Sequence, residues 1–500
     1  MKILFRILTI LLLFVILFQG SVPALSAPVP ASVPANLLGV AVGAYLRPTE
    51  NWGNDAAGFK QAVGANGLSI LNYYLGWLDG DTSSSHVYNT QMLDRIRAAT
   101  QPNYPVIMVT WQPLGATIAS GCTKNYGPSQ MIPYSDLIAG VCDPYIRQFA
   151  ADLSGRPERF LIRFANEMNV DASQWWPGHF GLGADVYVTA YRHVYDVFMQ
   201  AQRTAGNVNA EWVWAPNYFS SPAVTWNLLH NYYPGDQYVD WIGLSGYNWS
   251  PSINEPYRTF SEVFGEVDGS NVYYSSFLPG VLYDLACRYA KPQIIAEYGT
   301  VTNPANLQQK QAWITDTFSR VPNYPFLRAV VWYNDYLDGT NIDFRITNTP
   351  FGSVPAGITS AYRSAISEAT YQKTLPSLKD ATPPSTYCAS SMQTGPTFKL
   401  TPSGLLGVRG KSYDIYLIGL FYSSRPTVKI NLPSGVNITG QVIIDGLNPP
   451  WGRDQIRFNI GSNVPNGKYA FTIQVDGTDY PIIITVTDKI YPVFLPITTR

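Results

Sequence analysis

The stretch Arg159–Asn169, RFLIRFANEMN, combines a short apolar run with a polar cluster directly behind it. Phe160–Phe164 is apolar apart from Arg163, which is typical of a strand covered on both faces. Glu167 and two asparagines follow where this strand should end. A second stretch of the same kind, Gln293–Gly299, carries Glu297. Carboxylates at the C-terminal ends of buried parallel strands occupy the functional face of a barrel, so both glutamates are candidate site residues.

Apolar or aromatic runs of strand length recur along the chain, separated by segments long enough for helices. Tyr187–Ala205 and Leu307–Phe318 carry apolar positions at helical spacing. Alternating strands and helices predict parallel strands with crossover helices, and eight units predict a (β/α)8 barrel. A doubly wound open sheet is the alternative, but the sequence lacks the Gly-rich nucleotide loop typical of that class. The eight expected strands lie in Leu38–Tyr45, Leu68–Tyr74, Val106–Trp111, Arg159–Asn169, Glu211–Asn217, Asp240–Asn248, Gln293–Gly299 and Leu327–Tyr333.

The N-terminal segment 1–27 has the pattern of a secretory signal peptide. Lys2 and Arg6 supply a positive start, the apolar run Ile7–Phe18 follows, and small residues then suit cleavage. An uncleaved membrane anchor is the alternative, but the run is short for a full span. We therefore expect a secreted protein that is not inserted in a membrane after cleavage.

Composition restricts the classes of ligand. The formal net charge is −1 and charged residues are 13% of the chain, so nothing suggests a nucleic-acid partner. Aromatic residues are 14%, which suits a neutral, polyhydroxylated ligand and equally a large core. The four cysteines fit an oxidising compartment, with Cys122–Cys142 and Cys287–Cys388 as expected pairs and free thiols as the alternative. No spacing indicates a metal site, and we expect no cofactor and a monomer.

The sequence changes character after about Tyr371. A Pro-, Ser- and Thr-rich stretch predicts a linker, and short alternating strands with turn signals follow it. They predict a small all-β, immunoglobulin-like sandwich. Its role would be that of a spacer or, with Trp451 as the candidate ring, of a sugar-binding module. The expected boundaries are 1–27 signal peptide, 28–36 spacer, 37–370 barrel, 371–396 linker, 397–488 sandwich and 489–500 C-terminal tail.

The two glutamates suggest a defined chemistry. Retaining glycoside hydrolysis uses two carboxyl groups about 5–5.5 Å apart, one donating a proton and the other attacking the anomeric carbon. Strand ends on opposite sides of a small barrel can provide this pair in Glu167 and Glu297. Three neighbours would serve the substrate. Asn166 could bind a sugar hydroxyl, Tyr247 could donate to the nucleophile, and Trp332 could form the floor beneath the sugar.

Three further side chains have two interpretations each. Trp175 and Trp176 could stack on neighbouring sugar units or simply pack within their loop. Arg163 could tether a carboxylate below the substrate, or it could be a buried charge with a purely structural partner. The glutamates themselves could cap helices, which would leave a glycan-binding barrel without catalysis or a structural surface protein.

Several motifs together resemble glycoside hydrolase family 26. Arg163–Asn169 with the trailing Trp175 and Trp176 resembles the acid/base motif of that family, and Lys291–Gly299 resembles its nucleophile strand. The likeness extends over residues 38–370. Similar stretches between the two motifs are Tyr191–Phe198, Glu211–Asn217, Tyr233–Gly243 and Gly246–Asn248.

This resemblance implies a retaining endo-β-glycanase with Glu167 as acid/base and Glu297 as nucleophile. The family includes β-mannanases, β-1,3-xylanases and mixed-linkage glucanases, and mannan is our first expectation for the substrate. Two positions depart from the family pattern. Asn166 stands where the family usually has histidine, and the aromatic residue that usually follows is displaced to Trp175. Both positions belong to the expected sugar subsites, so they bear on the substrate rather than on the chemistry.

Overall fold

The computed structural model describes the barrel region and parts of the C-terminal region. The described ranges are 39–49, 51–77, 90–118, 120–222, 227, 229–250, 257–265, 281–324, 326–368, 370–381, 405–408, 412–417, 427–430, 436–444, 454–475 and 478–487. The expected signal peptide, the spacer, most of the linker, the tail and Trp451 lie outside these residues.

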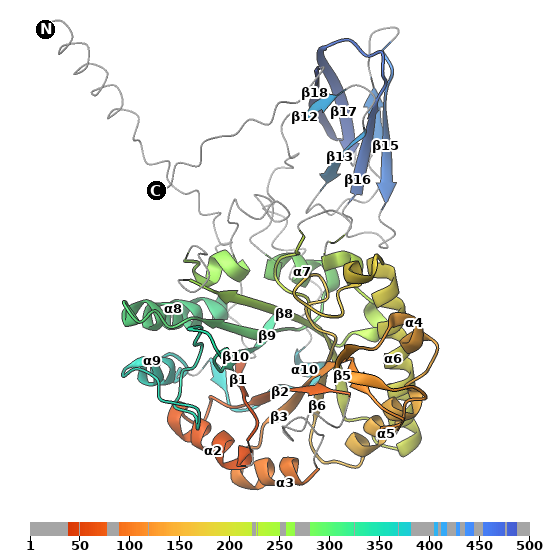
Figure 1. The fold of residues 1–500 in the computed structure, drawn as a ribbon. Helices are drawn as coiled ribbons and strands as arrows, with labels where there is room; N and C mark the ends of the chain where they lie inside the picture. The colour runs from red at the N-terminus through yellow and green to blue at the C-terminus, as the bar shows by residue number, and fades with distance from the viewer. Residues whose placement is uncertain are drawn as a thin grey trace, which may run out of the picture. The chain divides into compact units, whose positions relative to one another are not determined.

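Eight parallel strands close into a barrel (Figure 1). They pair in the order β10-β9-β8-β7-β6-β3-β2-β1, and β10 also pairs with β1, so the ring has no open edge. Each strand overlaps its expected run, which confirms the (β/α)8 barrel. The strands are β1 (Val40–Leu46), β2 (Ile70–Gly76), β3 (Val106–Gln112), β6 (Phe160–Phe164), β7 (Ala210–Trp214), β8 (Trp241–Asn248), β9 (Gln293–Thr300) and β10 (Leu327–Asn334).

Helices surround the strands (Figure 1). The two expected helices are confirmed as α6 (Ala184–Ala205) and α8 (Leu307–Arg320). Within the described ranges, no helix is both long and apolar enough to span a membrane. The others are α2 (Trp52–Val63), α3 (Thr90–Ala99), α4 (Tyr134–Ile138), α5 (Asp143–Ser154), η1 (Pro177–Phe180), η3 (Leu229–Tyr232), η4 (Asp236–Tyr238), η5 (Ser261–Gly265), α7 (Val281–Tyr289), η6 (Val321–Asn323) and α9 (Ile358–Ala365).

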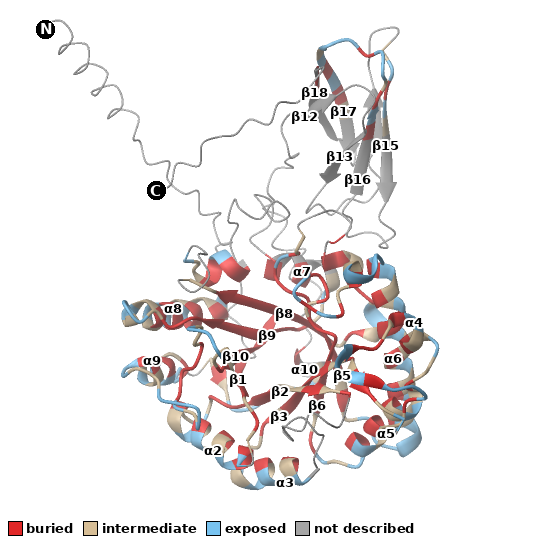
Figure 2. Cartoon of the chain, viewed as in Figure 1, coloured by how far each residue is buried: buried red, intermediate tan, exposed pale blue. Residues whose placement is uncertain are grey.

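The barrel strands are buried on both faces (Figure 2). Alternate side chains point to opposite faces of a strand, so each strand contributes to two apolar clusters. One cluster fills the barrel interior. It contains strand residues such as Met108 and Leu161, together with residues of the chain that follows α9. The other contains helix residues such as Phe198 and Trp313 and lies between the strands and the helices. This alternation decides which side chains can reach the barrel mouth.

The chain after α9 belongs to the barrel, so our expected domain end at residue 370 is too early. The short strand β11 (Tyr371–Gln372) pairs with β1, and helix α10 (Leu378–Ala381) follows it. Arg159 donates to the carbonyl oxygens of Leu375 and Pro376, at 3.1 and 2.6 Å. Leu375 and Ala381 contribute to the interior cluster. The barrel core therefore extends to Ala381.

A disulfide joins Cys122 to Cys142, as predicted. It connects the loop of the hairpin β4 (Leu114–Ala116) and β5 (Tyr126–Met131) to the residue before α5. The second expected pair involves Cys388, which lies outside the described residues.

The C-terminal region contains two sheets, in which all described strand pairs are antiparallel except the parallel pair β12 and β18. Their orders are β12-β18-β17-β14 and β13-β16-β15, and the rings of Phe458 and Phe471, one from each sheet, lie 5.0 Å apart. The immunoglobulin-like topology stays a prediction. The strands are β12 (Leu405–Val408), β13 (Ser412–Leu417), β14 (Thr427–Ile430), β15 (Ile438–Ile444), β16 (Asp454–Ile460), β17 (Gly467–Val475) and β18 (Thr478–Thr487).

Candidate active site

Glu297, near the C-terminal end of β9, accepts hydrogen bonds from three side chains. The guanidinium of Arg163 donates to its Oε2 at 2.6 Å, and the Tyr74 hydroxyl donates to the same oxygen. The Tyr247 hydroxyl donates to Oε1. These donors come from β6, β2 and β8, so they converge on the carboxylate from around the barrel. Hydrogen bonds to the charged form favour a carboxylate over a carboxylic acid.

Burial and the nearby Glu297 carboxylate raise the pKa of the Tyr74 and Tyr247 phenols well above the usual range. Burial acts to lower the pKa of Arg163, but Glu297, Tyr74 and Glu167 together outweigh it and raise the pKa above its ordinary value. All three groups are therefore protonated donors near neutral pH.

Arg163 is fully buried in the barrel interior. It also donates to the hydroxyls of Ser245 and, at 3.3 Å, of Thr110. The Thr110 hydroxyl in turn donates to Asn72 Oδ1 at 2.8 Å. Arg163 therefore has the first of its two expected roles, since its guanidinium tethers a carboxylate, that of Glu297.

Glu167 lies just past the end of β6 in an unusual backbone conformation. Ala165 and Glu167 have φ angles of 42° and 56°, in the left-handed region that non-glycine residues seldom adopt. The Glu167 amide donates to the Ala215 carbonyl at 2.8 Å, which anchors this turn to the end of β7. Asn217 Nδ2 then donates to Glu167 Oε1 at 2.9 Å. Backbone strain of this kind is commonly found where a functional side chain must be aimed.

The environment of Glu167 favours a protonated carboxyl group. Burial, followed by the negative charge of Glu297, raises its pKa to about 7, although Arg163 and the Asn217 hydrogen bond act in the opposite direction. Glu167 can therefore hold a proton near neutral pH beside a carboxylate that three donors stabilise as an acceptor. Two carboxyl groups in unlike environments are the arrangement that divides acid and nucleophile roles.

Tyr247 donates to Glu297, as expected, whereas a substrate contact of Asn166 stays a prediction. Asn166 is buried, and within the described part of the chain its Oδ1 has no hydrogen-bond partner. A ligand hydroxyl would satisfy that oxygen, whose desolvation otherwise costs about 1–3 kcal/mol.

The two loop tryptophans differ. Trp175 is buried, and its indole N–H donates to the Asn166 carbonyl at 2.7 Å, so it supports the loop and our stacking prediction for it is wrong. Trp176 is only partly buried, and its N–H donates to Asn227 Oδ1 at 2.8 Å. A stacking role for Trp176 stays a prediction.

Trp332 does not form the floor of the site, so this prediction is wrong. Its ring is fully buried in the cluster between strands and helices, 5.7 Å from the ring of Trp313 on α8. Its N–H donates to the Phe344 carbonyl at 2.8 Å. Val331 belongs to the interior cluster, so Trp332 points outward and the next residue, Tyr333, points inward. The Tyr333 ring stacks on Tyr45 at 5.0 Å, at the barrel mouth.

Our sequence analysis missed Tyr74, Asn217, Ser245 and Tyr333. Each lies inside an expected strand run, at or near its C-terminal end. Strand position was therefore a usable signal. The sequence does not show which side chains of a barrel strand point inward, because both faces of the strand are buried and equally apolar.

Replacing Tyr247 by Phe is expected to lower kcat by about 10–100-fold, since a hydrogen bond to a charged group contributes about 1.5–3 kcal/mol. Tyr298→Phe is the matched control, since Tyr298 is the next residue on β9 but packs outward on Trp332. A loss of kcat in Tyr298→Phe equal to that in Tyr247→Phe would contradict this role.

Within the described ranges, no group of three or more His, Cys, Asp or Glu side chains is arranged to hold a metal ion. At the barrel mouth, two glutamates in unlike environments lie at strand ends, which is the arrangement that glycoside hydrolases use.

Comparison with known proteins gives the family. Residues 146–298, which include Glu167 and Glu297, match the family model of glycosyl hydrolase family 26. Endoglucanase H of Acetivibrio thermocellus is 26% identical over 357 residues, which are 69% of this chain and 32% of the relative. The chain therefore spans about a third of the length of that relative. Over residues 146–298, the chain is therefore similar to glycoside hydrolase family 26.

Solved structures with similar folds include family 26 enzymes. Bacillus subtilis mannanase BCman is 16% identical, with a TM-score of 0.42 over 69% of this chain and 92% of that one. Bacillus subtilis mannanase man26 is also 16% identical, with a TM-score of 0.39 over 65% and 92% of the two chains. The family 26 domain of a Prevotella bryantii endo-β-mannanase/endo-β-glucanase is 16% identical, with a TM-score of 0.36 over 67% and 90%.

Proposed function

We propose that this protein is a secreted, retaining endo-β-glycanase in which Glu167 is the acid/base and Glu297 the nucleophile. The observation that carries the proposal is the contrast between the two carboxyl groups. Glu297 accepts three hydrogen bonds from protonated donors, while the pKa of Glu167 is raised to about 7.

The reaction would proceed in two displacements. In the first, the Glu297 carboxylate forms a bond to the anomeric carbon while Glu167 gives its proton to the departing glycosidic oxygen. In the second, the Glu167 carboxylate takes a proton from water, and the water oxygen displaces Glu297 from the anomeric carbon. Both glutamates then return to their starting states, and the anomeric configuration is retained.

The substrate would be a neutral β-linked polysaccharide. The family resemblance favours mannan, whereas the name of the Acetivibrio relative, endoglucanase, favours a β-glucan. Mixed-linkage β-glucan and β-1,3-xylan are therefore the alternatives. A glycan-binding barrel without catalysis is the remaining candidate, and the acid-like environment of Glu167 argues against it.

The test is an assay of the chain from residue 28 onward on β-mannan, mixed-linkage β-glucan and xylan. We expect release of reducing ends from at least one of them, with the product first formed as the β-anomer in a proton NMR time course. An α-anomer formed first would exclude the retaining mechanism, and no cleavage of any of the three would exclude the proposal.

The pH dependence should follow from Glu167. Because the acid must carry its proton and its pKa is raised to about 7, kcat/KM should fall above about pH 7, by about tenfold per pH unit. Asn217→Ala removes a hydrogen bond that lowers this pKa, so the basic limb should move to higher pH in that variant. A basic limb that does not move would argue against Glu167 as the acid.

Secretion is part of the proposal because residues 1–27 have the pattern of a signal peptide. The N-terminal sequence of the protein recovered from culture medium would test it, and a start near residue 28 is expected.

A further inference from the structure

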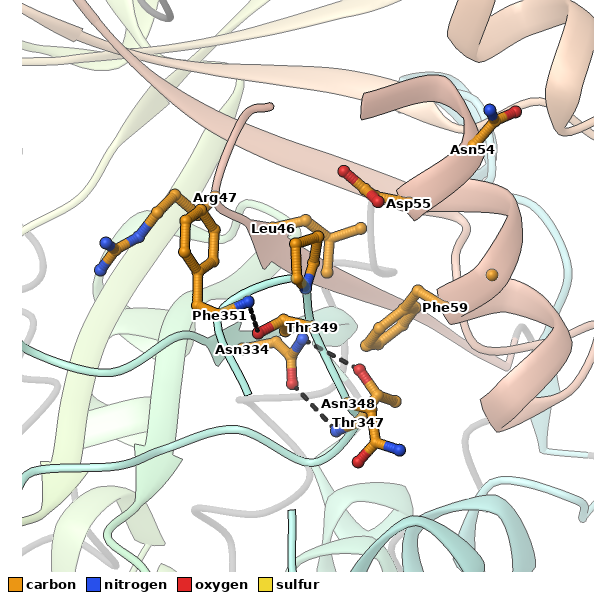
Figure 3. Close-up of a pocket in the computed structure, with 12 residues that line it drawn as sticks. Leu46, Arg47, Asn54, Asp55, Phe59, Asn334, Thr347, Asn348, Thr349 and Phe351 are labelled. Atoms are coloured by element: carbon orange, nitrogen blue, oxygen red, sulfur yellow. Dashed lines mark hydrogen bonds between the residues drawn. The ribbon is translucent and has the colours of Figure 1, made fainter. Parts of the chain in front are cut away.

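A cavity of about 200 Å³ lies outside the barrel interior, between α2 and the chain that follows β10 (Figure 3). We call it the α2 pocket. One wall is formed by Asp55, Gly58 and Phe59 of α2, and the opposite wall by residues 347–351. The ends of β1 and β10, at Leu46 and Asn334, complete its lining.

The pocket is shaped before any ligand arrives. The Asn334 side-chain oxygen accepts hydrogen bonds from the backbone amides of Ile346 and Thr347, at 2.7 and 3.2 Å. Its side-chain nitrogen donates a hydrogen bond to the Thr347 hydroxyl at 3.1 Å. Thr349 and Gly352 exchange two backbone hydrogen bonds, of 2.9 and 3.0 Å, which close the turn between them. A preformed concavity binds at lower entropic cost than one that must be ordered.

The lining combines an exposed ring with polar side chains. Phe351 is 42% exposed although it faces the pocket, and Phe59 lies buried on the other wall. Asn348 uses its Oδ1 to accept the Val354 amide at 2.8 Å, which leaves its amide protons for other acceptors. An apolar ring beside a few convergent hydrogen-bonding groups is suited to a sugar, which has C–H faces and hydroxyl edges.

The charges around the pocket disfavour an anionic ligand, because the Asp55 carboxylate lines it and the lining cation Arg47 is already paired. The Arg47 guanidinium bonds to Asp335 at 2.9 Å, to Asp338 at 2.8 Å and to the Tyr336 carbonyl at 2.8 Å. It also lies over the Phe351 ring, 4.9 Å from the centroid, and extends away from Asp55 and Phe59 (Figure 3). The positive charge of Arg47 is therefore neutralised by carboxylates of the protein, and its guanidinium packs on the Phe351 ring. Arg47 is thus not available to pair with an anionic ligand.

Gly58 lies in the α2 wall of the pocket. A glycine within a helix lowers stability by about 0.8–1.0 kcal/mol relative to alanine. No close packing requires it here, because a Cβ at this position would meet no atom within 4 Å. A large side chain at this position therefore has room to narrow the pocket from the α2 wall.

The pocket borders the candidate active site along β1. Tyr45 lies 4.9 Å from the ring of Tyr74, which donates to Glu297. Leu46 and Arg47, the next two residues, line the pocket. Strands advance about 3.3 Å per residue, so the pocket begins within about 7 Å of Tyr45 along the strand.

We propose that the α2 pocket binds one sugar unit of the same polysaccharide chain that is cleaved at Glu167 and Glu297. The proposal rests on the proposed function, and it adds a binding subsite remote from the scissile bond. Such a subsite increases the affinity for long polysaccharide chains. It does not change the affinity for substrates that are too short to reach it.

The test fills the pocket instead of removing a contact. Gly58→Phe is compared with Gln61→Phe, which adds the same ring to an exposed position of α2 that does not line the pocket. Each variant is assayed on the polysaccharide that the wild type cleaves fastest and on an aryl β-disaccharide. The readout is the ratio of the two kcat/KM values, polysaccharide over disaccharide.

We expect Gly58→Phe to lower this ratio by about tenfold, mainly through KM, which corresponds to the loss of one modest binding contact. Phe351→Ala should lower it in the same direction, and Gln61→Phe should leave it at the wild-type value. An unchanged ratio in Gly58→Phe, or equal losses on both substrates, would overturn the subsite while leaving the proposed function intact. A wild type that cleaves no polysaccharide would overturn both.

Discussion

Glu297→Gln is expected to lower kcat by at least about 10⁴-fold, because an amide cannot form the glycosyl-enzyme bond and removal of a nucleophile is among the most damaging changes to an enzyme. The measurement is the initial rate of reducing-sugar release. The variant also leaves the buried Arg163 without its counter-charge, which can cost about 3–5 kcal/mol of stability. A loss of activity could therefore reflect unfolding.

Glu297→Asp separates the two effects. It keeps the negative charge opposite Arg163, so the unfolding midpoint should stay closer to that of the wild type. It also withdraws the carboxylate by about one methylene, and a misplacement of about 1 Å can cost about 10²-fold in rate. We expect a folded protein with a loss of at least that size. Wild-type activity in Glu297→Asp would refute the nucleophile assignment.

Glu167→Gln is expected to lower kcat/KM on the polysaccharide by about 10²–10⁴-fold, the usual contribution of general acid catalysis. The loss should depend on the leaving group. A sugar hydroxyl leaves poorly without a proton, whereas a nitrophenolate leaves well without one. Nitrophenyl glycosides should therefore be bound and attacked by Glu297 with a much smaller loss in this first step. An equal loss for both substrate types would contradict the acid role of Glu167.

Stability provides the control for Glu167→Gln. The folded protein binds a proton at Glu167 more tightly than the unfolded chain does, since burial raises its pKa to about 7. The stability associated with this group is therefore present at low pH and is lost as the pH rises toward 7. At pH 8 the ionised Glu167 is unfavourable in the folded state, so the neutral glutamine should give an unfolding midpoint no lower than that of the wild type. A lower midpoint at pH 8 would mean that Asn217 and its neighbours need the carboxylate.

The sequence predicted the positions of all eight strands because a parallel barrel leaves a strong pattern. Strands buried on both faces are continuous apolar runs, and crossover helices separate them at regular intervals. Glu167 and Glu297 were recognisable for a related reason, since a carboxylate that interrupts an apolar run at its C-terminal end is unexpected in a core. These features depend only on local sequence.

Trp332 shows where that reasoning stops. Val331, Trp332 and Tyr333 are all compatible with either face of a buried strand, so composition cannot tell which of them points inward. Strand β10 also shifts its register against β9 between Val330 and Trp332, which breaks simple counting from the strand start. The network beneath Glu297 was hidden for a further reason. Arg163, Thr110 and Ser245 come from three strands and meet only when the barrel closes.

The sequence by itself determined the barrel, the two glutamates and the strand ends on which they lie. The reason is that the hydrophobic pattern of a strand, and a polar residue that interrupts it, depend only on residues close together in the chain. Only the tertiary structure supplies a physical basis for dividing the acid and nucleophile roles between the two glutamates. That difference arises because Tyr74, Arg163 and Tyr247, from separate strands, converge on Glu297, while burial and the charge of Glu297 act on Glu167. Electrostatic environments are sums over atoms that are distant in the chain, so no local pattern encodes them.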